Sequence, residues 1–172
     1  DITVDPEERR IFGSNTIRYR VMESAQVLQI DLQPPLRISS VEQNGKELEI
    51  RQEGSAHFIV LKEEQSIGEY NEVRVNYGGI PREAMRPPWD GGITWKEDGN
   101  GLPFIASSCQ GIGASIWWPN KDHMYDEVDS MLISVRIPDN LMNVSNGRLR
   151  RVDEHEDGTK TWNWFIANPI NN

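Results

Sequence analysis

The sequence contains a single cysteine, Cys109, and only three histidines. One cysteine excludes an internal disulfide and a cysteine-rich zinc site. The histidines lie far apart, and none belongs to an HExxH motif, the helical spacing that places two imidazoles on one zinc ion. We therefore expect no catalytic residue, no metal ligand and no cofactor within this chain.

Positive charge is also scarce, because 18 Lys and Arg residues stand against 27 Asp and Glu residues, a net charge of −9. Nucleic acids and anionic membranes need a basic surface, so neither is expected as a partner. The sequence has no apolar run long enough to cross a bilayer and no signal-peptide pattern at its start. Cationic groups, such as the amino termini of peptides, would instead be mildly attracted.

A sustained helical period is missing as well. The 172 residues are 37% hydrophobic and 26% charged, the composition of one globular domain spanning residues 1–172. Apolar residues alternate with polar ones in short segments, as in Ile17, Tyr19 and Val21. Such segments, separated by Asn-Gly and Asp-Gly turns, predict an all-β fold: a β-sandwich or a saddle-like pair of curved sheets.

The expected strands share this alternation, and they cover residues 16–21, 28–32, 38–41, 48–50, 58–61, 73–77, 131–137, 148–152 and 161–165. Asn44-Gly45 predicts a hairpin between residues 38–41 and 48–50, and Asp157-Gly158 predicts pairing of the last two strands. Residues 80–122 are rich in Pro, Gly and Trp, which predicts a long irregular insert. Long loops on a β scaffold often carry binding residues.

Within this insert, residues 103–122 read PFIASSCQGIGASIWWPNKD. Gly111 and Gly113 have no Cβ, so a backbone or a ligand can approach closely there. Gln110 offers a carbonyl acceptor and two amide donors beside this opening. This combination suits recognition of a small polar group, and the alternative is a strand with a glycine bulge beneath a tryptophan lid. Cys109 is interpreted as a small buried hydrophobe rather than a nucleophile.

The segment SCQGIGASIWWPNKD resembles the part of the aminopeptidase N family of zinc metallopeptidases that closes the non-catalytic side of the substrate pocket. Three more segments match in order: PPWDGGITWKEDGNGLP, YDEVDSM and VSNGRL. The likeness spans essentially the whole chain but only the N-terminal domain of such an enzyme. It implies a β domain followed by a catalytic domain, absent here, that holds the zinc ion and the catalytic glutamate.

By this resemblance, Gln110 takes the position of the family's Glu or Gln that contacts the free α-amino group of a peptide substrate. Cys109, Gly111 and Ile112 would line the same subsite. An ammonium has three donors, and a fixed carboxamide oxygen accepts one of them. The implied partners are the amino terminus of a peptide substrate and the catalytic domain of the same polypeptide. The parent protein would be a zinc aminopeptidase, and this stretch by itself would be inactive.

The sequence departs from the family pattern at Ser115, where many members carry Arg, and in the spacing of the carboxylates after Pro119. These departures imply a divergent bacterial branch, with a lean toward an exported or cell-envelope protein. The carboxylates are calcium candidates by ligand type, although acidic surface is the simpler interpretation. They are Asp122, Asp126, Glu127 and Asp129.

Two other functions stay open. One is a carbohydrate-binding β-sandwich in which tryptophans form an aromatic platform for sugar rings, although buried tryptophans pack equally well in a core or a domain interface. The platform would consist of Trp89, Trp95, Trp117 and Trp118. The other is a purely structural interaction domain, which predicts no pocket near Gln110.

Overall fold

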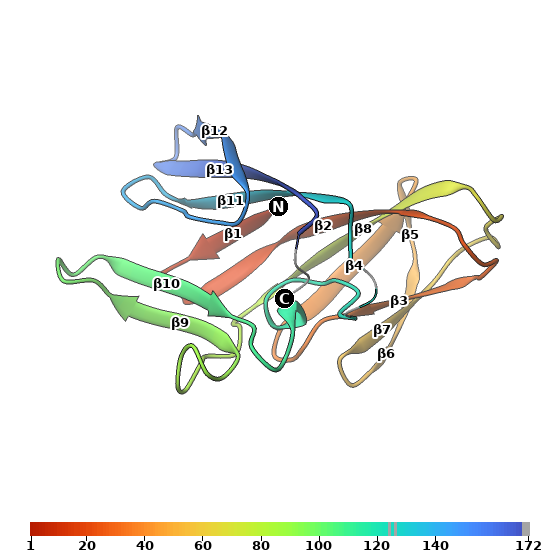
Figure 1. Ribbon diagram of the computed structural model, residues 1–172, viewed down its shortest axis with the longest axis horizontal. Coiled ribbons are helices and arrows are strands. Elements are labelled where there is room, and N and C mark those ends of the chain that lie inside the picture. Colours follow the sequence, from red (N-terminus) through yellow and green to blue (C-terminus); the bar gives the residue numbers. More distant parts are fainter. Residues whose placement is uncertain (124, 126, 170–172) are drawn as a thin grey trace.

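The computed structural model describes residues 1–123, 125 and 127–169 (Figure 1). These residues form thirteen strands and one short 3-10 turn, η1 (Ala114–Ile116). The strands, in chain order, are β1 (Ile2–Asp5), β2 (Arg10–Arg20), β3 (Val27–Asp31), β4 (Arg37–Gln43), β5 (Lys46–Glu47), β6 (Glu49–Glu53), β7 (Ala56–Val60), β8 (Tyr70–Gly79), β9 (Gly92–Glu97), β10 (Pro103–Ser108), β11 (Ser130–Pro138), β12 (Arg148–Glu154) and β13 (Thr159–Ala167).

Eight strands form one large sheet in the order β12-β13-β11-β1-β2-β8-β4-β5. The sheet is mixed, because β1 runs parallel to β11 and antiparallel to β2. Three strands form a second sheet in the order β3-β7-β6, and β9 and β10 form a separate hairpin. In Figure 1 the three-stranded sheet and the hairpin lie at opposite ends of the long sheet.

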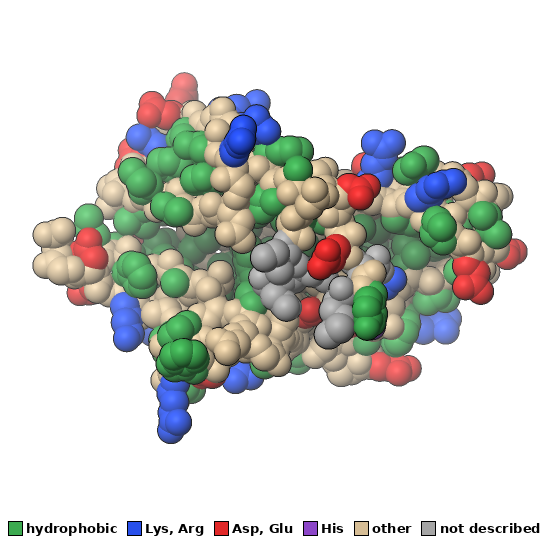
Figure 2. All heavy atoms as spheres, viewed as in Figure 1, with side chains coloured by type: hydrophobic (Ala, Val, Ile, Leu, Met, Phe, Trp, Pro, Cys, Tyr) green, Lys and Arg blue, Asp and Glu red, His purple; other side chains and the backbone are tan. Residues whose placement is uncertain are grey.

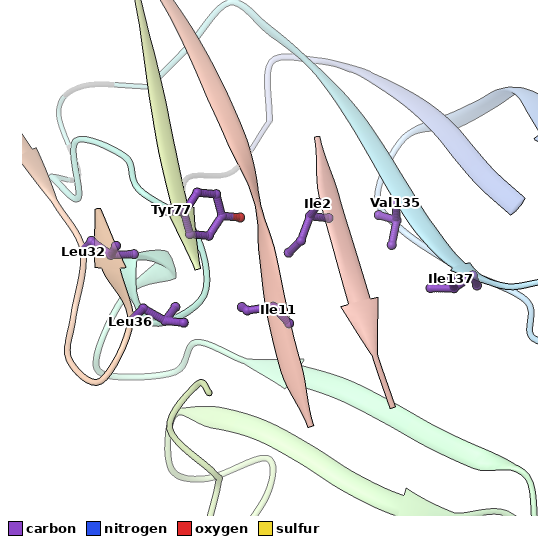
Figure 3. Close-up of a cluster of buried hydrophobic side chains, with 7 residues drawn as sticks. All are labelled: Ile2, Ile11, Leu32, Leu36, Tyr77, Val135 and Ile137. Carbon is purple, nitrogen blue, oxygen red and sulfur yellow. The ribbon is translucent and has the colours of Figure 1, made fainter. Parts of the chain in front are cut away.

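Both smaller units pack on the same face of the large sheet. Val73, Val75 and Tyr77 alternate along β8 and are buried on that face. One core cluster lies between the large sheet and the second sheet and contains Ile30, Val41, Leu48, Ile59, Leu61, Val73 and Val75. The other lies beside the hairpin and contains Ile2, Ile11, Leu32, Leu36, Tyr77, Val135 and Ile137 (Figure 3).

The all-β, saddle-like architecture predicted from the sequence is confirmed. The Asn44-Gly45 turn is also confirmed, with φ angles of 52° and 72°, but it joins β4 to the two-residue strand β5. Leu48 still donates its N–H to the Val41 carbonyl at 2.8 Å, and the chain then crosses to the second sheet as β6. The last two strands pair across Asp157-Gly158 as expected.

The prediction of an irregular insert over residues 80–122 is wrong in part, because it contains the regular β9–β10 hairpin. The side chain of Asp98 fixes the connecting turn: its Oδ1 accepts N–H groups from Asn100 at 2.8 Å and Leu102 at 3.0 Å. Because this region is rich in Pro, Gly and Trp, its two six-residue strands were not recognised in the sequence. Within the described part of the chain, no helix has the length and apolar character needed to span a membrane.

Candidate functional site

The candidate site is a tight turn that follows directly on β10. The Cys109 carbonyl accepts N–H groups from Ile112 at 3.2 Å and Gly113 at 3.0 Å, so the chain reverses within five residues. Gly111 has φ 76° and Gly113 has φ 81°, a region that glycine adopts without steric cost. The turn leads into η1, whose three residues are buried. Gln110 and Gly111 therefore form the tip of a turn that is anchored on its inner side.

A neighbouring carboxylate leaves no room for a side chain at Gly113. A Cβ placed on Gly113 would lie 2.1 Å from Oδ2 and 2.4 Å from Oδ1 of Asp122. The same Oδ2 accepts the N–H of Ser115 at 3.1 Å, so the carboxylate caps the start of η1. A Cβ on Gly111 would meet nothing within 4 Å. The close approach expected at these glycines is thus made by Asp122 at Gly113, while Gly111 faces open space.

The end of β3 holds the turn from the other side. Gln33 donates Nε2 to the Ile112 carbonyl at 2.6 Å and to Ser115 Oγ at 2.9 Å, and its N–H bonds the Ser115 carbonyl at 2.9 Å. Just before it, Asp31 and Asn120 exchange two backbone hydrogen bonds of 2.7 and 3.1 Å. These contacts fix the backbone on both sides of the tip, which limits the directions available to its side chains.

Gln110 is exposed at this tip. Within the described residues its carboxamide makes no hydrogen bond, so both the oxygen and the NH₂ group remain able to bind an external group. The side chain is not sealed in the packing between the sheets. An exposed carboxamide on a fixed backbone is the main polar feature of the site.

The other three residues expected at the subsite are placed differently. Cys109 is half-buried; burial raises the pKa of its thiol, the Asp122 carboxylate adds to the rise, and the Trp117 indole opposes it. This thiol is therefore not activated for nucleophilic attack. Ile112 packs on Gly91, since a Cβ there would lie 1.8 Å from Ile112 Cδ1. Gly111 shares the exposed tip with Gln110.

The Ile112–Gly91 contact brings a second loop to the site, and the sequence analysis, which named Trp89 and the PPWDGG segment of this loop, predicted no subsite residue there. Asp90 organises it by accepting the N–H groups of Met85 and Arg86, each at 2.6 Å. Desolvation opposes these bonds, but together with Arg82 they lower the pKa of Asp90. Trp89 is 75% exposed on this loop. In the sequence, Asp90 follows the two backbone groups that it caps by five and four residues.

The tryptophans do not form a platform for a sugar. Trp95, Trp117 and Trp118 are half-buried and pack against the core cluster beside the hairpin. The rings of Trp117 and Trp118 meet edge to face, with centroids 6.1 Å apart and an interplanar angle of 62°. Of the four tryptophans considered, only Trp89 is exposed. The carbohydrate-binding alternative therefore loses its structural basis.

Among the acidic residues that follow the site, Asp122 makes local hydrogen bonds. Asp122 is engaged with Ser115 as described, and its own N–H bonds Asp31 Oδ2 at 3.1 Å. Glu127 and Asp129 are exposed, while Asp126 lies outside the described residues. In residues 1–123, 125 and 127–169, no group of three or more His, Cys, Asp or Glu side chains is arranged to hold a metal ion.

Two surface cavities lie away from the turn, near the tip of the hairpin. One, of about 460 Å³, is lined by Pro6, Arg9, Trp95, Lys96, Glu97, Pro103 and Ile105. The other, of about 380 Å³, lies between the same hairpin and β1 and β11, and Pro6 and Pro103 border both. Gln110 lines neither of these two cavities and is exposed at the tip of the turn.

Comparison with known proteins finds similar folds among solved structures. No protein-family model and no curated protein matches the sequence. Among solved structures, the chain is similar to an M1 zinc metallopeptidase mutant from Deinococcus radiodurans bound to a Tyr-Ser-Ala substrate, with 24% identity and a TM-score of 0.76. A two-domain M1 zinc metallopeptidase mutant bound to L-arginine matches at 23% identity and the same TM-score.

Each match covers 95% of this chain and 37% of the solved chain, so this chain spans little more than a third of the length of these enzymes. The resemblance seen in the sequence is thereby confirmed at the level of the fold. The extent of the match is that of one domain of a two-domain protein. The chain has the β fold of the corresponding part of the M1 zinc metallopeptidases.

Proposed function

We propose that this chain is the N-terminal domain of a zinc aminopeptidase and that Gln110 binds the free α-amino group of the peptide substrate. The observation that carries the proposal is an exposed carboxamide, without a hydrogen bond in the described part of the chain, on a turn that Asp122 and Gln33 hold in place. The fold match to M1 zinc metallopeptidases, two of them with a bound substrate or amino acid, supports the same assignment.

In this role, the Gln110 oxygen accepts one N–H of the substrate ammonium. A carboxamide is neutral at every pH, so this contact persists at a pH where a carboxylate would be protonated. The contact requires a free amino end, which an internal peptide bond lacks, and this restricts cleavage to the first residue. A second domain of the same polypeptide supplies the zinc ion, the chemistry and an acidic partner for the ammonium. Cys109, Gly111 and Ile112 form the wall of the subsite on this side.

The test is kinetic and uses the polypeptide that joins this domain to its catalytic domain. Gln110→Ala is expected to lower kcat/KM for alanine p-nitroanilide by about 5- to 150-fold, which corresponds to roughly 1–3 kcal/mol for a lost polar contact to a charged group. Gln52→Ala, which changes an exposed glutamine on β6, serves as the matched control and should leave kcat/KM unchanged.

Two results would contradict the proposal. Wild-type kinetics in Gln110→Ala would remove this residue from the site. Turnover of alanine p-nitroanilide by the pure 172-residue chain, or stoichiometric zinc in that chain, would show that the chemistry is not confined to a second domain.

A further inference from the structure

The edge strands of the sheets differ in charge, length and regularity. The edge strand β12 carries the run Arg148, Leu149, Arg150, Arg151 and a register shift, and β6 carries Glu49, Arg51 and Glu53. Charges and bulges of this kind prevent an exposed edge from pairing with another chain. The edge strand β5 is only two residues long. β10, with the sequence PFIASS, has six residues, no charge and no register shift.

The free backbone groups of β10 follow from its pairing with β9. Ile93, opposite Ser107, uses its N–H and carbonyl on the far side of β9, to the Arg82 carbonyl at 2.7 Å and the Ala84 N–H at 3.1 Å. Ser107 and Ile93 are therefore a non-hydrogen-bonded pair. Because such pairs alternate, Ile105 and Ser107 direct their N–H and carbonyl groups away from β9.

This outward side of β10 is open. Within the described residues, β10 pairs only with β9, and no other backbone group bonds Ile105 or Ser107. The cavity of about 380 Å³ between Pro103 and the strands β1 and β11 lies at the start of β10. Figure 2 shows the surface hollowed between the hairpin and the end of the molecule formed by β11, β12 and β13.

The strand also leads directly to the candidate site. Ser108 ends β10, and Gln110 follows two residues later at the tip of the turn. A chain that lay along the open side of β10 would thus have one end beside Gln110 and would extend toward Pro103.

We propose that the open edge of β10 binds the main chain of the peptide substrate as an added antiparallel strand, with the free amino end at Gln110. This inference rests on the proposed function of Gln110. Ile105 and Ser107 then each exchange two main-chain hydrogen bonds with the peptide, independent of its side chains. The alternation of β10 leaves its side chains outside this contact, which permits a broad range of peptide sequences.

The spacing sets a length requirement. Strands rise about 3.4 Å per residue, so Ile105 and Ser107 are roughly 7 Å apart along β10. The turn at Cys109 and Gln110 separates both residues from the contact with the amino end. A peptide bound at Gln110 therefore needs several residues to reach Ser107 and two more to reach Ile105. Dipeptides and amino-acid anilides would contact Gln110 alone, whereas a hexapeptide would use the edge.

Hydrogen exchange on the 172-residue chain tests the edge directly. Unblocked hexa-alanine at millimolar concentration is expected to slow amide exchange at Ile105 and Ser107, and alanyl-alanine at the same concentration is expected to leave both unchanged. The side-chain NH₂ signals of Gln110 report the amino-end contact separately. Unchanged exchange at both amides with hexa-alanine would overturn the added strand, even where the Gln110 signals move.

A pair of variants separates the backbone contact from the side chain. Ser107→Pro removes the outward N–H and leaves the β9 ladder intact, since that N–H takes no part in it. We expect it to weaken hexa-alanine binding by about 3- to 10-fold, the effect of one main-chain hydrogen bond, and to leave alanyl-alanine unaffected. Ser107→Ala keeps the N–H and should bind both peptides as the wild type does.

Two further outcomes decide against the proposal. Equal hexa-alanine affinity in Ser107→Pro and Ser107→Ala would show that the outward N–H is not used. Protection of Ile105 and Ser107 that grows with protein concentration, without peptide, would identify a second copy of the chain as the occupant of the edge. Loss of the Gln110 response to both peptides would instead contradict the proposed function itself.

Discussion

The carboxylate of Asp122 occupies the space that a side chain on Gly113 would need, with Oδ2 only 2.1 Å from the position of a Cβ. Because the same oxygen caps the N–H of Ser115, the glycine and the aspartate act as one unit nine residues apart. The backbone at Gly113, with φ 81° and ψ 170°, is also in a region that is essentially restricted to glycine. The exposed turn therefore depends on a contact made beneath it.

This relationship predicts different costs for two neighbouring glycines. Gly113→Ala should lower the free energy of unfolding by about 3 kcal/mol or more, because backbone strain adds to the collision with Asp122. Gly111→Ala, with φ 76° and open space around it, should cost about 1–2 kcal/mol from backbone strain alone. Urea unfolding measures both. Equal losses would show that the Asp122 carboxylate moves aside without cost.

Gln33 should control the rigidity of the turn. Its Nε2 bonds the Ile112 carbonyl and Ser115 Oγ, so Gln33→Ala leaves a half-buried carbonyl and a buried hydroxyl without this donor. We expect a loss of about 1–3 kcal/mol in unfolding free energy and faster amide exchange at Ile112 and Gly113. The Gln52→Ala variant, which removes an exposed bond to the Gly54 carbonyl away from the turn, should leave the exchange at Ile112 and Gly113 unchanged. Unaltered exchange at Gly113 would mean that Asp122 holds the turn alone.

The sequence allowed prediction of the all-β class, most of the strands and the Asn44-Gly45 turn, because alternation and turn chemistry act locally. The sequence did not predict which sheet the residues after this turn would join. The N–H of Leu48 still bonds the Val41 carbonyl, but the residues that follow form β6 in the three-stranded sheet. That choice depends on burial against the Ile59 side of the second sheet. Such a decision is made by tertiary packing and leaves no local pattern.

The candidate site, like the fold, was predictable from the sequence only in part. The sequence predicted an opening at the glycines beside Gln110, but it did not predict the tight turn, and the close approach at Gly113 was attributed to a backbone or a ligand rather than to the Asp122 side chain. The contacts of Gln33 with Ile112 and of Asp31 with Asp122 span 79 and 91 residues of sequence, so no spacing rule connects these partners to the turn. Whether Gln110 binds an amino group stays a prediction until the kinetic test is made.

The tryptophans allow an optical test of the rejected sugar platform. Trp89 is 75% exposed, whereas the other five tryptophans are half-buried. Iodide should therefore quench one fraction of the emission efficiently, and Trp89→Phe should remove most of that fraction without lowering the melting temperature. Trp117→Phe, at a half-buried position against the core, serves as the contrast. Efficient quenching that persisted in Trp89→Phe would show an additional exposed tryptophan and would again support a sugar-binding platform.

The pH dependence of stability should report on His57 in β7. This side chain is 3% exposed, and its Nδ1 lies 3.1 Å from the Ser55 carbonyl. Burial lowers its pKa below the usual 6.5, and the Ser55 carbonyl and Asp31 only partly offset this. The folded state thus favours the neutral ring, so its contribution is complete above pH 6.5 and is lost as the pH falls through the lowered pKa. Melting temperatures from pH 7.5 to pH 5 should fall more steeply for the wild type than for His57→Asn, which keeps a donor near Ser55 but cannot titrate. Parallel curves would indicate that the ring accepts its proton without cost in the folded protein, which would require water or a carboxylate to reach it.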